Sequence, residues 1–97
     1  MKLKGFAESR TVHLDGEYLD PSDSQIVVNH SPDGFNWGYG GSGPAQLALA
    51  VMLKYWSKEK ALEKYQDFKW QVIASLEQGK DFEIEFDKSW VEDRVNN

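Results

Sequence analysis

The fold is decided by residues 44–56, whose sequence is PAQLALAVMLKYW. Gln46 and one lysine are the only strongly polar side chains in this stretch, so a helix formed by it is apolar on nearly every side. We therefore expect this helix to be the buried centre of the molecule. Pro44 suits its first turn because the missing N–H would have no partner there, and Ser42 or Gly43 is the expected N-cap.

A second helix is expected directly after the first. Ser57 is a suitable N-cap, the helical pattern continues to about Gln78, and Gly79 provides a left-handed stop. One face of this helix carries the apolar side chains of Ala61, Leu62, Tyr65, Phe68, Val72, Ile73 and Leu76. Trp70 lies on the opposite face, where a tryptophan is either a second packing contact or an anchor for a partner.

The N-terminal third of the chain is predicted to form strands. In residues 11–19, apolar and polar side chains alternate on either side of Asp15-Gly16. This dipeptide favours a two-residue hairpin turn because both positions tolerate positive φ. Residues 3–7 are a further strand candidate. The β-branched run at 25–28 is short enough to predict another strand.

The C-terminal part predicts one more strand and a short helix. Residues 82–86 alternate strictly, with both glutamates on the face expected to meet water. Asp87 or Ser89 is a candidate cap for a last helix that runs to Arg94. The element order predicts a single α+β domain over residues 1–97. In it, a small antiparallel sheet, formed by the N-terminal hairpin and further strands, packs on two consecutive helices.

Composition and charge exclude several classes of function. The chain has 11 Lys and Arg against 16 Asp and Glu, and its net charge of -5 argues against binding to nucleic acid or an anionic membrane surface. It has no cysteine, and the spacing of its 2 histidines starts no metal site. No apolar run approaches the roughly 20 residues of a membrane helix, and charge and glycine interrupt the N-terminus where a signal peptide needs an apolar core. We therefore expect a cytoplasmic protein without a metal ion.

Residues 35–43, FNWGYGGSG, have the composition of a loop. Gly38, Gly40 and Gly43 match the spacing of the dinucleotide-binding fingerprint ahead of a helix. The fingerprint also needs an acidic residue at the end of a second strand about 20 positions later, whereas here a second helix follows. We therefore expect no cofactor, and we interpret the glycines as permitting positive φ and tight packing.

The same loop is a candidate anion site, because consecutive glycine amides before a helix form a concave nest whose N–H groups attract negative charge. No Walker-type lysine follows Gly43, so nucleotide triphosphate hydrolysis has no support. His30, Asp33 and Ser42 can be written as a catalytic triad, but they are more naturally two turn residues and a helix cap. No complete catalytic constellation is present, and we expect no enzymatic activity.

Three aromatic residues alternate with smaller residues in this loop. Phe35, Trp37 and Tyr39 would either stack on a base, a sugar or a partner's side chain, or close over one end of the central helix. We favour packing for Phe35. Both readings stay open for Trp37 and Tyr39, whose polar groups suit an interface.

Two tracts resemble the signatures of a small family from bacteria, archaea and their phages. They are residues 29–50, NHSPDGFNWGYGGSGPAQLALA, and residues 65–74, YQDFKWQVIA. Residues 12–20 are also similar, whereas the tail from Gly79 departs from the pattern. The family is classed as a domain of unknown function, so the resemblance implies no activity. It directs attention to positions 30–46 and 66–70.

These observations favour a non-enzymatic binding module that recognises a partner protein or a small anionic ligand through loop 30–46. A phage- or plasmid-type accessory protein that binds a host protein is one concrete form. The alternative is a small enzyme or sensor that holds a phosphate or carboxylate at the loop, with His30 as acid or base. A third reading is that the tract only packs the core. Either a monomer or a homodimer is compatible with an exposed aromatic loop. The candidate binding residues are His30, Asp33, Trp37, Gly38, Tyr39, Gly40, Gly41, Ser42, Gly43, Gln46 and Trp70.

Overall fold

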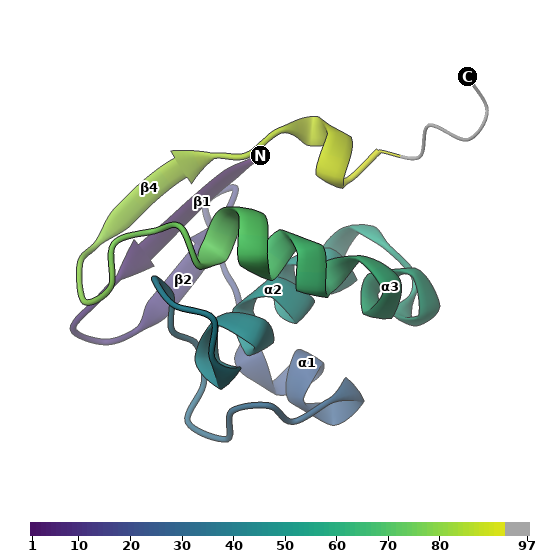
Figure 1. The fold of residues 1–97 in the computed structure, drawn as a ribbon, viewed down its shortest axis with the longest axis horizontal. Helices are drawn as coiled ribbons and strands as arrows, with labels where there is room; N and C mark the ends of the chain where they lie inside the picture. Colours follow the sequence, from purple (N-terminus) through teal and green to yellow (C-terminus); the bar gives the residue numbers. More distant parts are fainter. Residues whose placement is uncertain (93–97) are drawn as a thin grey trace.

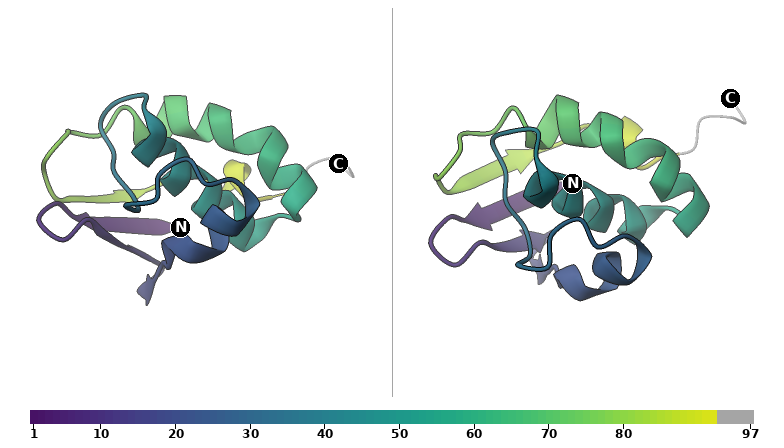
Figure 2. Two further views of the ribbon diagram at one scale, coloured as in Figure 1. Left: turned by 90° about the horizontal axis from the view of Figure 1, so that it is seen from below. Right: turned by 60° about the horizontal axis from the view of Figure 1, so that its bottom comes forward.

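The computed structural model describes residues 1–92, in which an antiparallel sheet carries helices on one face and leaves the other uncovered (Figures 1 and 2). The strands are β1 Lys2–Phe6, β2 Thr11–Leu14, β3 Glu17–Tyr18 and β4 Phe82–Glu85. The helices are α1 Pro21–Val27, α2 Ser42–Tyr55, α3 Lys58–Phe68, the π-helical turn η1 Lys69–Ile73 and the 3-10 turn η2 Lys88–Trp90. The α+β fold is therefore confirmed. The expected end of the last helix at Arg94 lies outside the described residues.

The sheet has the strand order β3-β2-β1-β4, with every pair antiparallel. Asp15 and Gly16 have φ of 50° and 84°, which confirms the predicted hairpin turn between β2 and β3. Leu3 of β1 pairs with Leu14 on one side and Ile84 on the other, and these side chains face the helices. Alternation then places the charged residues of β1 and β4 on the uncovered face.

The expected strand at residues 25–28 is wrong, because residues 21–27 form α1. The Asp20 carboxylate accepts a hydrogen bond from the Ser22 amide at 2.9 Å, and Pro21 occupies the first helical turn. Ser24 is then fully buried against α2. A helix cap and one tertiary contact thus outweigh the β propensity of a short β-branched run.

The predicted central helix is α2, and its position at the centre of the fold is confirmed. Every residue from Gly43 to Met52 is buried. The expected N-cap is wrong: Gly41 holds that position, and the helix begins at Ser42. Pro44 still lies in the first turn, where it forfeits no intrahelical hydrogen bond.

Ser57 caps α3 as predicted, since its hydroxyl accepts a hydrogen bond from the Lys60 amide at 3.3 Å. The expected continuation to Gln78 is wrong. The helix widens into the π turn η1, closed by the Ala74 amide donating to the Lys69 carbonyl at 2.7 Å, and ends there. Gly79 does have a left-handed φ of 76°, but it lies in a later turn.

The predicted apolar face of this segment is confirmed across the π turn. Buried or partly buried side chains keep helical spacing from Ala61 through Tyr65 and Phe68 to Ile73. The Ile73 carbonyl, at the end of the turn, accepts a hydrogen bond from the Gly38 amide, which ties the Gly-rich loop to this turn.

The predicted C-terminal strand is confirmed as β4, with its two glutamates exposed. Asp87 is the cap of η2, and its carboxylate accepts from the Ser89 amide at 2.8 Å. Phe86 and Trp90 pack edge-on against Phe68 of α3 at centroid distances of 5.2 and 5.3 Å. Within residues 1–92, none of the helices has both the length and the apolar character that crossing a bilayer demands.

Candidate functional site

The first two aromatic residues of the Gly-rich loop point into the core. Phe35 is 2% exposed and Trp37 is 1% exposed. The Trp37 indole N–H donates to the Lys80 carbonyl at 2.9 Å, and its ring packs edge-on against Phe82 at a centroid distance of 4.8 Å. Because both rings are enclosed, neither is accessible to a partner while the loop keeps this conformation.

The glycines let this loop pack closely on its surroundings. Gly38 has a φ of 86°, and its N–H donates to the Ile73 carbonyl at 3.0 Å. A Cβ at Gly38 would overlap the backbone of Gln78, and one at Gly43 would collide with Asn36. A larger residue at either position would therefore separate the loop from the elements that hold it.

Trp70 lies on the outside of the same loop. Its side chain is 59% exposed, and its ring rests on Gly40, where an added Cβ would overlap the indole. The Lys69 ammonium lies 4.3 Å from the ring centroid and 3.5 Å from the Gly40 carbonyl oxygen. Lys69 lies on the inner side of this segment, where the residue is 7% exposed, and Trp70 lies on the outer side.

Tyr39 completes an accessible aromatic pair. It is 36% exposed, and its ring lies against Gly41 so closely that a Cβ there would overlap it. Tyr39 and Trp70 therefore flank the backbone of Gly40 and Gly41. We call these four residues the Trp70 surface.

Gln46 lies one helical turn into α2 and is completely buried. Its amide oxygen accepts hydrogen bonds from the backbone N–H groups of His30 and Ser31 at 2.7 and 2.9 Å. Its amide nitrogen donates to the Ser24 hydroxyl at 2.9 Å and to the Val28 carbonyl at 3.0 Å. All four hydrogen-bonding positions of the side chain are thus used to hold the segment after α1, and Gln46 is not on the accessible surface.

The three residues of the possible catalytic triad are not joined. His30 Nε2 shares a hydrogen bond with the Tyr65 hydroxyl at 2.9 Å. Asp33 is exposed in the turn that ends at Gly34, where it lines a cleft of about 120 Å³ together with Arg10. Ser42 is exposed at the start of α2. No hydrogen bond links these three side chains in the part of the chain that the structure describes.

The N-terminus of α2 is electropositive. No side chain caps it, no acidic residue lies in its first turn, and Lys69 approaches the carbonyl just before the cap. Unpaired first-turn N–H groups and the helix dipole favour a negative charge at such an end. Ser42 is exposed there, so the end is open to solvent.

A family model matches residues 4–96. The chain belongs to DUF6166, a family of unknown function. No curated protein and no solved structure matches it. Membership of DUF6166 assigns no activity, so the argument for a function rests on the Trp70 surface and on the start of α2. In residues 1–92, no three carboxylate or imidazole groups come together as a metal site would require.

Sequence reasoning overlooked Lys69, which joins the two parts of this site. A signal for it was present: Lys69 follows Tyr65 by four residues, so a regular helix already turns it toward the apolar face. A lysine at such a position is buried along its alkyl stem and needs a partner for its ammonium group. The Gly40 carbonyl and the Trp70 ring supply that partner.

Proposed function

We propose that this protein is a non-enzymatic binding module of the cytoplasm and that a partner protein docks on the Trp70 surface. The observation that carries the proposal is that the Trp70 ring is 59% exposed although its position is fixed by Gly40 and Lys69. An aromatic side chain held in place before binding loses little conformational entropy on binding. Such residues are frequent hot spots of protein interfaces.

The surroundings of the ring suit a mixed apolar and polar contact. Tyr39 adds a second ring with a hydroxyl group, and the glycine backbone between the rings offers polar groups to a partner. From the family resemblance, the specific form that we propose is a phage- or plasmid-type accessory protein whose partner is a host protein.

Quantitative cross-linking and affinity capture from a lysate of the native host tests the proposal. Tagged full-length Trp70→Ala and Tyr39→Ala should lose the principal captured protein by about 30-fold, the effect of a hot spot of about 2 kcal/mol. Ile26→Ala is the matched control, because Ile26 is an 83% exposed apolar residue on α1. Equal capture by Trp70→Ala and the wild type, with both shown to be folded by circular dichroism, would contradict the proposal.

A second candidate is a small anionic ligand at the start of α2. The observation that favours it is Lys69, a 7% exposed cation with no carboxylate partner among the described residues, beside an uncapped helix end. An amide NMR titration with phosphate and nucleotides would follow Gly40, Gly41 and the Trp70 indole. Saturable shifts that are confined to these groups, and that disappear in Lys69→Met, would favour the anionic-ligand site. If the wild type shows no such shifts, the protein-binding module remains the proposed function.

A further inference from the structure

The β4 strand forms a free edge of the sheet. The Phe86 amide donates to the Met1 carbonyl at 3.0 Å, so the backbone groups of alternate residues on this strand point toward β1. The N–H and C=O groups of Glu83 and Glu85 therefore point away from the sheet. No backbone group within residues 1–92 pairs with them. The opposite edge, β3, is only 2 residues long.

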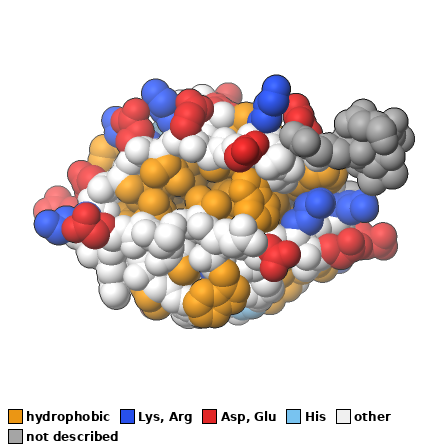
Figure 3. Space-filling view, turned by 45° about the horizontal axis from the view of Figure 1, so that its top comes forward, with side chains coloured by type: hydrophobic (Ala, Val, Ile, Leu, Met, Phe, Trp, Pro, Cys, Tyr) orange, Lys and Arg blue, Asp and Glu red, His pale blue; other side chains and the backbone are white. Residues whose placement is uncertain are grey.

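Beside this edge the inner face of the sheet is incompletely covered. Phe82 and Ile84 of β4 point inward but are only partly buried, as are Val72 in η1 and Leu76 just after it. Figure 3 shows hydrophobic side chains as a continuous band along this side of the molecule, bordered by charged residues. An added strand would thus find backbone partners on β4 and apolar surface for its inward-facing side chains.

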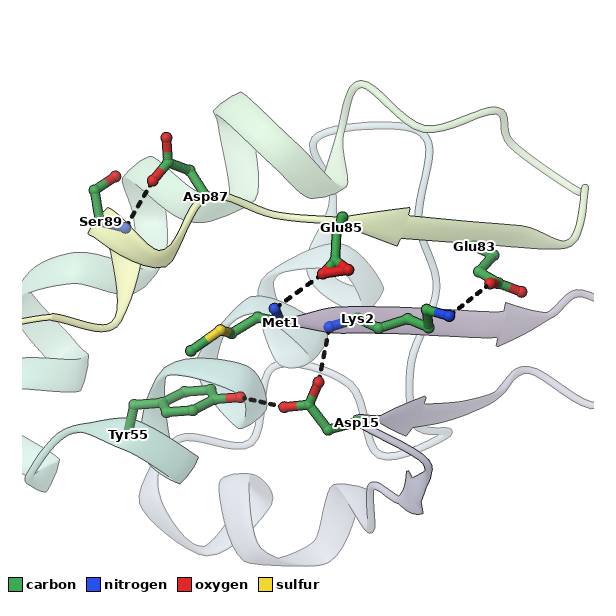
Figure 4. Close-up of polar contacts among 8 residues, drawn as sticks. All are labelled: Met1, Lys2, Asp15, Tyr55, Glu83, Glu85, Asp87 and Ser89. Atoms are coloured by element: carbon green, nitrogen blue, oxygen red, sulfur yellow. Dashed lines mark hydrogen bonds and ion pairs between the residues drawn. The ribbon is translucent and has the colours of Figure 1, made fainter.

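Charge determines which strand fits. On the outer face Glu83 lies 3.2 Å from Lys2, and Glu85 lies 3.1 Å from the N-terminal ammonium of Met1 (Figure 4). Glu83 also lies 3.7 Å from Lys4. Across the outer face of the sheet, the positively charged side chains of β1 therefore lie beside the negatively charged side chains of β4. A basic residue opposite each glutamate on a new strand would continue this alternation, whereas an acidic residue would be placed opposite a like charge.

The same charges disfavour a second copy of this chain. Antiparallel pairing of β4 with itself would bring the carboxylates of Glu83 and Glu85 from the two copies opposite each other. Charged residues on an edge strand commonly prevent such self-association. They also select among foreign strands, since they reject acidic segments.

We propose that the β4 edge binds an extended segment of a partner protein by antiparallel strand addition. In this segment basic residues alternate with apolar ones, so that the basic residues lie opposite Glu83 and Glu85 and the apolar residues enter the band beside Ile84. This surface uses none of the residues of the Trp70 surface, and the two proposals can fail separately.

The test uses three synthetic peptides and amide NMR of the full chain. The probe acetyl-TVKVRVT-amide carries two basic residues on one face and three valines on the other. Its isomer acetyl-VTKVVRT-amide breaks the alternation, and acetyl-TVEVEVT-amide reverses the charge. We expect saturable shifts and slowed amide exchange at Glu83 and Glu85 with the probe, and at least about tenfold weaker binding of the other two peptides.

Substitutions at the two glutamates separate backbone pairing from charge. Glu85→Pro and Glu85→Gln both remove the carboxylate, but only proline also removes the N–H that points away from the sheet, so Glu85→Pro should weaken peptide binding more than Glu85→Gln without disturbing the β1–β4 ladder. The double variant Glu83→Lys/Glu85→Lys should prefer the acidic peptide, whereas Glu59→Lys/Glu63→Lys on α3 changes the net charge equally and should keep the wild-type preference.

Three results would overturn the proposal. The first is the absence of saturable shifts with the probe, and the second is equal binding of the acidic peptide. The third is protection of the Glu83 and Glu85 amides that rises with protein concentration in the absence of peptide, which would assign this edge to a second copy of the chain.

Discussion

Replacing Gln46 by Leu should destabilise the protein by about 3–5 kcal/mol. The side chain is completely buried, and its four hydrogen bonds hold Ser24, Val28, His30 and Ser31 against α2. Leucine has a similar volume, so the cavity contribution is small. The loss comes from the four hydrogen bonds themselves, because the Ser24 hydroxyl still donates to the Pro21 carbonyl and the His30 amide still donates to the Val28 carbonyl.

The magnitude follows from where these groups lie. Only the bond between Gln46 and the Ser24 hydroxyl is fully buried, while the three bonds to backbone groups are part-buried and their groups regain some contact with water. At about 1 kcal/mol for each of the four hydrogen bonds, with a spread of about a quarter either way, the sum is about 3–5 kcal/mol. A chain of 97 residues has a total stability of about 5–15 kcal/mol. The variant should therefore melt at least about 12 °C below the wild type.

Urea unfolding followed by circular dichroism measures this difference as a change of midpoint at constant m value. Gln66→Leu is the matched control, because Gln66 is exposed on α3 and its side chain makes no hydrogen bond within the described residues. Faster exchange of the His30 and Ser31 amides should accompany the loss of stability. If Gln46→Leu costs less than about 1 kcal/mol, or no more than the control, the assignment of Gln46 as the anchor of this segment is refuted.

Two further substitutions test local geometry. Gly40→Ala should displace the Trp70 ring, because the new Cβ would overlap it, and should lower the free energy of unfolding by about 1–3 kcal/mol. The NMR signal of the Trp70 indole N–H should shift in this variant and stay unchanged in the control Ser42→Ala. Burial and the bond to Asp15 raise the pKa of Tyr55 to about 12, so Asp15→Asn should lower the midpoint of tyrosinate absorbance for that residue. The pKa of Asp15 lies below the ordinary aspartate value of 3.8, mainly because its carboxylate accepts a hydrogen bond from the Lys2 amide. Its contribution to stability is therefore present at neutral pH and lost as the pH falls through the folded-state pKa, so Asp15→Asn and the wild type should differ at neutral pH and converge in acid, once this carboxylate is protonated in both the folded and the unfolded protein. A difference that persists in acid would contradict this account.

Elements with a strong local signal were predicted correctly from the sequence. The central helix follows from an apolar stretch that only a buried position accommodates, and the hairpin follows from Asp15-Gly16, both of which have positive φ. The Ser57 cap and the alternation of β4 were also sufficient. In each case residues close in sequence carry the determining interaction.

Two of the three wrong predictions, the strand at residues 25–28 and the end of the second helix, have a different cause. Residues 25–28 contain a β-branched run, but Ser24 is hydrogen-bonded to Gln46, 22 positions away, and this contact belongs to a helix. The helix predicted to reach Gln78 ends after the π turn, where the Ile73 carbonyl accepts a hydrogen bond from the Gly38 amide of the distant loop. Propensity describes the isolated segment, whereas these outcomes depend on partners brought by the rest of the chain.

The sequence by itself located the candidate site, because a Gly-rich loop ahead of an apolar helix and a tryptophan off the apolar face are both visible in it. Tertiary structure alone decided which of these side chains are accessible. Trp37 is enclosed by Lys80 and Phe82, whereas Trp70 stays exposed with its ring against Gly40 of a loop about 30 positions earlier in the chain. Exposure is a property of packing between distant segments, and the pattern of residues along one segment does not contain it.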